Sequence, residues 1–392
     1  MRGADNHVVQ VDDYGQFWDP APAEAVLRQV RELSATRNVI VVVLVHGWNH
    51  NAAPDDGNLV DFAASLEQTR RLLTDATQAQ SALYRRSREE LTGTEDLTVI
   101  GVYIGWRGRS LPGWLNYATF WGRKAAAERV GQGDVREFLY RLNAIYKERA
   151  QARRAGQTRV FLGLTAIGHS FGGQVLFKAI AQDVENELIQ QAAPGRGPVE
   201  SLAGFGDLAV LVNPALEALQ YERIHRLASR LDLGPRQPPV LLVISSAGDI
   251  PRQLLFPAGR HLDTLHRPGF RPGQRELWVK ALGESVEQRT HRIEPVPAGS
   301  QRPPPFDPAL YTSDPCAIVR LDLTDVPFIQ GFKLVPTGEH RRHNPFLVAH
   351  ADIRLVLDHS AVFEPELRLF LNDYIAFTQG KRILLNSPLA GC

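Results

Sequence analysis

Ser170 lies at the centre of the stretch Gly-His-Ser-Phe-Gly-Gly, residues 168–173, between an apolar run and a segment with helical spacing of apolar residues. This is the G-x-S-x-G pattern in the strand, tight turn and helix context that presents a nucleophilic serine. Gly168, His169 and Gly172 would form the elbow, and its glycines leave room where the serine adopts a strained backbone conformation. The N–H of Phe171 would then lie at a helix N-terminus and could donate to an oxyanion. The alternative is a glycine-rich turn that merely contains a serine.

A second stretch, His46-Gly47-Trp48, directly follows another apolar run. A strand that ends in His-Gly brings bare backbone close to the nucleophile, so the N–H of Trp48 would be the second oxyanion donor. His46 and His50 also match H-x-x-x-H, but the Glu of H-E-x-x-H and the helix that would align two zinc-binding rings are missing. We therefore expect an oxyanion loop here and no metal site; the alternative is that both histidines are ordinary loop residues.

Together these two stretches resemble the α/β-hydrolase superfamily. Two further matches bring the resemblance to its serine esterase and lipase branch, close to a poorly characterised bacterial alpha/beta hydrolase-like group: Tyr-Ile-Gly-Trp-Arg-Gly at residues 103–108 and Asn-Pro-Ala at residues 213–215. The resemblance covers residues 36–260 and 344–380 and omits a Pro- and Arg-rich segment at 261–343. It implies the α/β-hydrolase fold and a catalytic triad in the chain order nucleophile, acid, histidine.

That order directs the search for the acid to the loop after a strand expected at residues 240–245. Asp249, in Ser-Ala-Gly-Asp-Ile-Pro, stands where this loop would present a carboxylate. The alternative is an aspartate that only shapes a Gly-Asp turn. Asp263 and Asp314 are further candidates inside the Pro- and Arg-rich segment.

The base is expected in a loop between the last strand and the last helix, and His359 fits this place. His350 is its main rival, although its position inside an extended run favours a packed or edge-strand histidine. His340 and His343 belong to a charged stretch typical of a solvated surface. Asp358 is a poor triad acid for its neighbour, because adjacent side chains point apart on an extended strand.

These residues predict a serine hydrolase that cleaves carboxylic esters. His359 would take the proton of Ser170 as Oγ attacks a carbonyl, and Asp249 would fix the tautomer of the imidazole without being protonated itself. Water would then hydrolyse the acyl-enzyme, so the reaction requires no metal and no organic cofactor. The alternatives are an acyltransferase, thioesterase or amidase that uses the same acyl-enzyme, and a catalytically silent α/β-hydrolase scaffold.

Residues near the two motifs are candidates for a substrate pocket. His46, Gly47 and Trp106 are expected to border the nucleophile. Aromatic side chains in the same loops could line an acyl or alcohol pocket or could belong to the core: Trp48, Trp114, Phe120 and Trp121.

Elements that could position these residues alternate along the chain. Six apolar runs predict strands, at residues 39–45, 97–104, 159–167, 208–212, 240–245 and 353–357. Helices are expected from Asn58 as N-cap, over residues 135–146, and from Pro365. The pattern predicts an α/β fold with a mostly parallel central sheet, helices on both faces, and a large irregular insertion before the last strand.

The insertion at residues 261–343 contains Pro-Pro-Pro at 303–305 and resists long helices and central strands. We expect it to be draped over one end of the sheet, with at most a short strand around residues 317–323; a disordered linker is the alternative. The triad candidates run from residue 170 to residue 359 and must meet in space. Residues 1–392 are therefore interpreted as a single domain.

Composition excludes several classes of protein. Lys+Arg 44 and Asp+Glu 43 give a net charge of +1, which argues against a nucleic-acid binder and suits a small-molecule or lipid ester substrate. Two cysteines are too few for a disulfide framework or a Cys-based zinc site. The longest apolar run, residues 39–45, is far below the roughly 18 residues that span a bilayer. Since the N-terminus lacks the apolar core of a signal peptide, a cytoplasmic location is expected, although export without such a peptide stays open.

Overall fold

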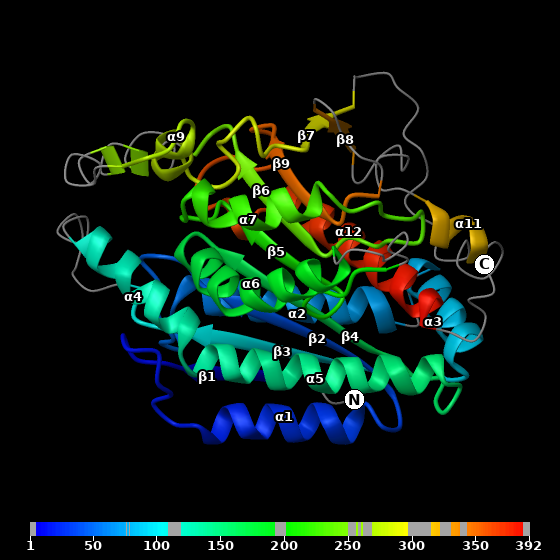
Figure 1. Ribbon diagram of the computed structural model, residues 1–392. Helices are drawn as coiled ribbons and strands as arrows, with labels where there is room; N and C mark the ends of the chain where they lie inside the picture. Colours follow the sequence, from blue (N-terminus) through cyan, green and yellow to red (C-terminus); the bar gives the residue numbers. More distant parts are fainter. Residues whose placement is uncertain are drawn as a thin grey trace.

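A central sheet organises the chain in a computed structural model (Figure 1). The residues described are 5–75, 77, 79–108, 119–192, 201–249, 256–257, 260–261, 269–296, 315–321, 331–337 and 343–386. Within them, nine strands form one sheet in the order β1-β3-β2-β4-β5-β6-β9-β7-β8. All neighbouring pairs are parallel except β7 and β8, which are antiparallel. The predicted α/β class with a mostly parallel sheet is confirmed.

The strands are β1 (Asp5–Gln10), β2 (Asn38–Val45), β3 (Leu97–Gly105), β4 (Leu162–His169), β5 (Leu208–Val212), β6 (Leu241–Ser246), β7 (His291–Pro295), β8 (Phe332–Pro336) and β9 (Phe346–Ala351). The helices are α1 (Ala21–Leu33), α2 (Gly57–Thr74), α3 (Ala79–Thr92), α4 (Phe120–Gln132), α5 (Asp134–Arg154), α6 (Phe171–Gln191), α7 (Ala218–Ala228), α9 (Gln274–Val279), α11 (Pro315–Arg320), α12 (Pro365–Leu385) and the short 3-10 helix η3 (Ala361–Phe363).

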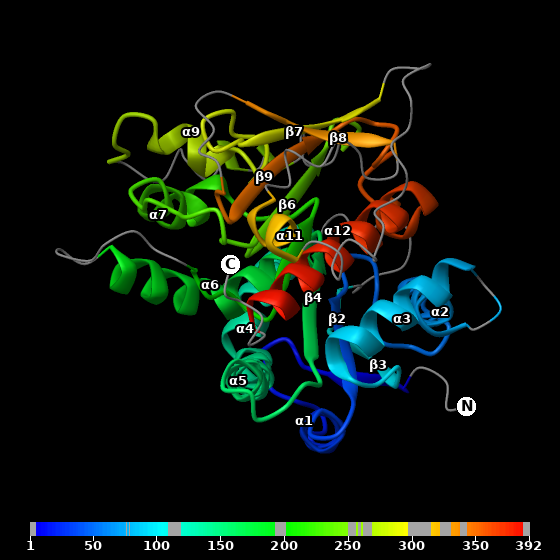
Figure 2. The same ribbon diagram turned by 90° about the vertical axis from the view of Figure 1, so that its right-hand side faces the viewer.

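Helices cover both faces of the sheet, as predicted. Figure 2 shows α1, α5, α6 and α7 on one side and α2, α3 and α12 on the other. One large apolar cluster joins the first group of helices to the sheet, and two smaller clusters lie beneath α12 and beneath α2. Burial on both faces explains why the central strands are continuous apolar runs rather than alternating ones.

The strand order reverses direction between β2 and β4. After β2 the chain moves outward to β3 and then returns to place β4 on the other side of β2. In open parallel sheets, the carboxyl ends of strands at such a switch point border the usual ligand crevice. The residues after β2 and β4 are the two stretches that the sequence singled out, so the topology brings them to one edge.

Several predicted boundaries are wrong. The core begins earlier than residue 36. Strand β1 pairs with β3, and the apolar residues of α1 belong to the large apolar cluster. The insertion is not merely draped over the sheet, since it contributes β7 and β8, which extend the sheet by two strands beyond β9. The expected strand around residues 317–323 is instead helix α11 as far as Arg320, and the last strand is β9, upstream of the predicted 353–357. The N-cap of α2 is Asp56, whose carboxylate accepts the N–H of Asn58.

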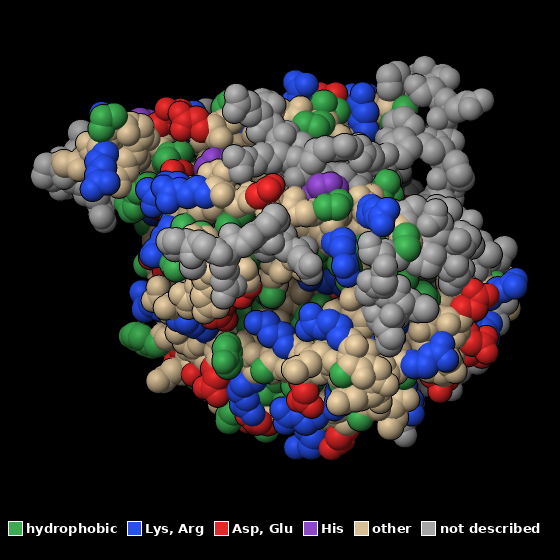
Figure 3. Space-filling model, turned by 45° about the vertical axis from the view of Figure 1, so that its right-hand side comes forward, with side chains coloured by type: hydrophobic (Ala, Val, Ile, Leu, Met, Phe, Trp, Pro, Cys, Tyr) green, Lys and Arg blue, Asp and Glu red, His purple; other side chains and the backbone are tan. Residues whose placement is uncertain are grey.

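The surface agrees with the near-zero net charge. On the face shown in Figure 3, Lys and Arg side chains are interspersed with Asp and Glu side chains. Over the described part of the chain, no helix combines the length and the apolar character needed to cross a membrane.

Candidate active site

Ser170 occupies the tight turn between β4 and α6. Its backbone angles, φ 56° and ψ −120°, lie in a region that non-glycine residues rarely adopt and that costs about 1–3 kcal/mol. A Cβ on Gly168 would lie 2.7 Å from the carbonyl oxygen of Gly172, and a Cβ on Gly172 would lie 2.1 Å from that of Val45. Both positions therefore require glycine, and the predicted elbow geometry is present.

The side chains of Ser170, His359 and Asp249 form a continuous hydrogen-bonded chain. Nε2 of His359 lies 2.7 Å from Oγ of Ser170, and Nδ1 of the same ring lies 2.7 Å from Oδ2 of Asp249. With an ionised Asp249, Nδ1–H donates to the carboxylate, which leaves Nε2 to accept the Ser170 hydroxyl proton. Asp249 is fully buried, whereas the side chain of His359 is 21% exposed.

The rival residues lie elsewhere. His350 is on β9, where its Nδ1 is 3.2 Å from Oγ of Ser245. The carboxylate of Asp358 accepts the N–H of Ser360. His343 precedes β9 with a positive φ of 60°. Three other candidates, His340, Asp263 and Asp314, lie outside the described residues.

The loop after β2 packs directly against Ser170. A Cβ on Gly47 would lie 2.9 Å from Cβ of Ser170 and 3.0 Å from Nδ1 of His169, so only glycine lets the backbone approach this closely. Phe171 is the first residue of α6, where N–H groups have no acceptor within the helix. The loop that carries Trp48 and the helix that begins at Phe171 therefore meet at Ser170, which is the arrangement expected of an oxyanion hole.

His46 supports this loop from behind. Its ring stacks between Tyr103 and Trp106, at centroid distances of 5.4 Å and 5.7 Å. Nδ1 lies 2.8 Å from the carbonyl oxygen of Gly47, and Nε2 accepts the backbone N–H of Trp106 at 3.0 Å. The indole N–H of Trp106 donates in turn to the carbonyl of His46 at 2.9 Å. Burial lowers the pKa of His46 to about 4, so the ring stays neutral at pH 7.

These contacts change the roles expected for two pocket candidates. His46 is fully buried and Trp106 is 2% exposed, and the polar atoms of both are used within the protein. They hold the loop in place instead of facing a substrate. Of the three predicted pocket residues, Gly47 is the one that lies against Ser170.

Part of the predicted aromatic lining does gather around Phe171, the residue after Ser170. The ring of Phe120, at the start of α4, lies 4.9 Å from that of Phe171, 5.3 Å from that of Trp48 and 5.1 Å from that of Trp121. Trp48 and Phe120 are half-buried, and Trp121 is exposed. Trp114 lies outside the described residues.

Two residues that hold the His359 loop were not predicted from the sequence. Nε2–H of His169 donates to the carbonyl of His359 at 2.6 Å, and Nδ2 of Asn213 lies 3.2 Å from the carbonyl of Asp358. Oδ1 of Asn213 also accepts the N–H of Ser246, three residues before the acid. The sequence places His169 in the elbow and Asn213 in the Asn-Pro-Ala stretch, but it does not reveal these roles. A side-chain hydrogen bond to a main-chain group far along the sequence has no local sequence pattern.

Comparison of the chain with protein-family models, with curated proteins and with solved structures gives no match. The chemistry that the site can perform therefore follows from its own geometry. A hydroxyl, an imidazole and a buried carboxylate in series can move a proton from Oγ to Nε2 and keep the resulting imidazolium paired.

Proposed function

We propose that this protein is a serine hydrolase that cleaves carboxylic esters on an α/β-hydrolase fold. Ser170 is the nucleophile, His359 the general base and acid, and Asp249 the residue that orients the imidazole. The observation that carries the proposal is the pair of 2.7 Å contacts that join these three side chains at a strained elbow. A structural serine would not require the backbone strain.

In the proposed reaction, Oγ attacks the ester carbonyl as Nε2 of His359 takes its proton. The backbone N–H groups of Trp48 and Phe171 stabilise the oxyanion, and the alcohol leaves with the proton that His359 returns. Water then attacks the acyl-enzyme with His359 again as base. The half-buried aromatic side chains around Phe171 favour an apolar acyl or alcohol group.

Labelling with an active-site fluorophosphonate tests the nucleophile. The wild-type protein should be labelled once, Ser170→Ala should not be labelled, and His359→Ala should be labelled at least a hundredfold more slowly. Ser229→Ala is the matched control, because the exposed hydroxyl of Ser229 donates to the carbonyl of Arg226 at the end of its own helix, α7. Labelling that survives Ser170→Ala would sink the proposal.

Turnover of short chromogenic esters, thioesters and amides, with and without an added alcohol, then identifies the acyl acceptor and the leaving group. Faster release of the leaving group with formation of a new ester would indicate acyl transfer by the same acyl-enzyme. Free acid as the product in both conditions is expected for a hydrolase.

A further inference from the structure

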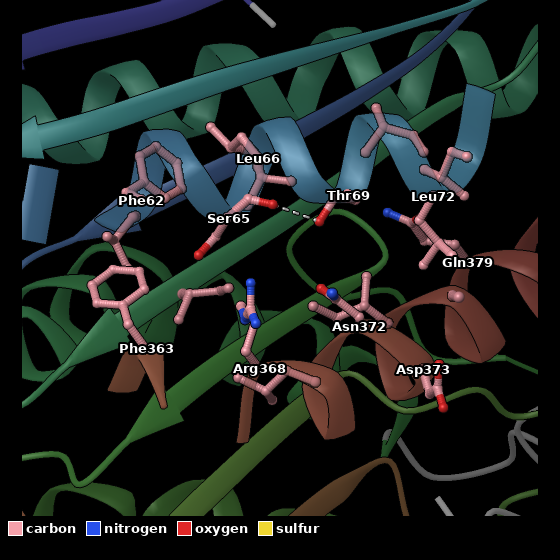
Figure 4. A pocket seen from close by; sticks show the side chains of 18 of the residues that line it. Phe62, Ser65, Leu66, Thr69, Leu72, Phe363, Arg368, Asn372, Asp373 and Gln379 are labelled. Carbon is pink, nitrogen blue, oxygen red and sulfur yellow. Dashed lines mark hydrogen bonds between the residues drawn. The ribbon is translucent and has the colours of Figure 1, made fainter. Parts of the chain in front are cut away.

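A cavity of about 120 Å³ lies between α2 and α12, on the face of the sheet that these helices cover. Figure 4 shows side chains from the two helices facing each other across it. Its floor is formed by strands β2 and β4 through Ile40, Val42, Leu44 and Ile167. Ser170, Asp249 and His359 are not among the lining residues, so the cavity is distinct from the candidate active site.

The floor of the cavity contains two apolar side chains of central strands that are only partly buried. Val42 is the one residue of β2 that is not buried, and Ile167 is the one residue of β4 that is not buried. Both strands lie in the middle of the sheet, with neighbours on each side. Apolar side chains in such a position normally lie beneath a helix, because leaving their surface accessible forfeits hydrophobic stabilisation. An apolar ligand that covered Val42 and Ile167 would recover it.

The rim of the cavity carries a cation. Arg368 projects from the first turns of α12 toward Ser65 on α2, whereas Asp373, the other charged lining residue, points away from α2 (Figure 4). Within the described part of the chain, Nε of Arg368 is buried and has no hydrogen-bond partner. A buried guanidinium nitrogen without a partner is costly, and the positive end of the α12 dipole adds to the potential there. Both features favour an anion at this rim.

We propose that this cavity binds a medium-chain fatty carboxylate, with the carboxylate on Arg368 and the alkyl chain on the floor of Val42 and Ile167. A guanidinium matches a carboxylate with two parallel hydrogen bonds. An engineered apolar cavity of about 150 Å³ holds benzene, so this slightly smaller cavity takes a chain of about five carbons beyond the head group. Longer chains extend out of the cavity.

Calorimetric titration with butanoate, hexanoate, octanoate and decanoate tests the proposal on the full chain. Each methylene that enters the cavity should tighten binding about fourfold, and the gain should stop between hexanoate and octanoate. Octan-1-ol, which lacks the charge, should bind more weakly than octanoate. Ser170→Ala should bind all of these like the wild type, so the outcome does not depend on the proposed hydrolase activity.

Variants distinguish this cavity from other sites. Arg368→Gln should weaken octanoate about tenfold and leave octan-1-ol unchanged, and Arg368→Lys should restore part of the loss. Ala376→Phe, which fills the cavity from α12, should abolish binding of both ligands, while Leu369→Phe, on the exposed side of the same helix, should not. Absence of saturable binding to the wild type, or equal binding to Ala376→Phe and Leu369→Phe, would overturn the proposal.

Discussion

The backbone carbonyl of His359 accepts a hydrogen bond from Nε2 of His169, 2.6 Å away. The residue beside Ser170 thus holds the loop that carries His359. Burial lowers the pKa of His169 to about 3, so the ring is neutral at pH 7 and carries its single proton on Nε2, which donates to the carbonyl. A neutral ring here places no like charge beside the imidazolium that His359 becomes in the proposed reaction. His169 is therefore a positioning residue.

Replacing His169 tests this role. In His169→Gln the side-chain amide can reach the carbonyl of His359 from nearly the position of Nε2, whereas the shorter Asn cannot. We expect kcat for ester hydrolysis to fall roughly 10- to 100-fold in His169→Asn, with little change in KM, and to recover largely in His169→Gln. Equal losses in the two variants would mean that the ring is needed for packing and not for its hydrogen bond.

Asn213, directly after β5, forms side-chain hydrogen bonds with Ser246 at the end of β6 and with Asp358 in the loop that carries His359. Its backbone has a positive φ of 45°. Asn213→Gly keeps this backbone conformation accessible and removes the side chain, whereas Asn213→Ala removes the side chain and adds strain of about 1–2 kcal/mol. Both should lower kcat by a similar factor, on the order of 100-fold. Only Asn213→Ala should show the further loss in unfolding free energy, which chemical denaturation measures. A kcat clearly higher in Asn213→Gly than in Asn213→Ala would mean that backbone strain, and not the loss of the hydrogen bonds, lowers activity.

Asp249→Asn retains the shape of the acid but places an amide where Nδ1 of His359 needs an acceptor. The imidazole can then take the tautomer that donates to Ser170 instead of accepting from it. We expect kcat to fall by about 10³–10⁴-fold, and fluorophosphonate labelling to slow in parallel, without loss of the folded state by circular dichroism. A loss below tenfold would indicate that Asp249 is not the orienting acid.

How far the sequence predicts this protein depends on whether a feature is local. The strand at residues 208–212 has its predicted bounds, because a fully buried parallel strand is a continuous apolar run. The G-x-S-x-G pattern is equally local, and Gly168 is required by contacts within the turn itself, whereas Gly172 is required by the carbonyl groups of Val45 and His46 at the end of β2. Such features are encoded over fewer than about ten residues, and over this range the pattern of apolar residues and glycines predicts local structure.

Non-local pairing accounts for the failures. The sequence offers two neighbouring apolar runs after residue 344, and the strand is β9 because Phe346 aligns with Leu241 of β6. β1 was missed since an edge strand with Asp5, Asn6 and His7 lacks the apolar signal of its neighbours. β7 and β8 were missed because they stabilise each other and β9 across about forty residues.

Gly47 offers a steric test of the proposed oxyanion loop. A methyl group there would meet Ser170 and His169 at 2.9–3.0 Å and would push the backbone of Trp48 away from the nucleophile. We expect Gly47→Ala to lower kcat for ester hydrolysis at least 100-fold, the usual effect of losing one oxyanion donor. Gly57→Ala, with nothing within 4 Å of the added methyl, is the control and should keep wild-type activity. An active Gly47→Ala would place the oxyanion hole elsewhere.

His46 makes stability depend on pH in a way that variants can isolate. Its pKa is about 4 in the folded protein against an ordinary value of 6.5, so the unfolded chain binds a proton that the folded chain does not. This contribution to stability is complete above pH 6.5 and is lost as the pH falls toward 4. Position 46 cannot titrate in His46→Gln or His46→Asn. Between pH 6 and 4.5, the unfolding free energy of both variants should therefore depend less steeply on pH than that of the wild type. The difference between the two slopes should be about 1.4 kcal/mol per pH unit.

The same two variants separate titration from hydrogen bonding. Gln can still accept the N–H of Trp106, as Nε2 of His46 does, whereas Asn leaves that buried donor without a partner at a cost of about 1–3 kcal/mol. At pH 8, denaturant titration should therefore show His46→Asn to be less stable than His46→Gln, while both share the flattened pH dependence. A wild-type slope in either variant would mean that His46 is not held neutral behind the oxyanion loop.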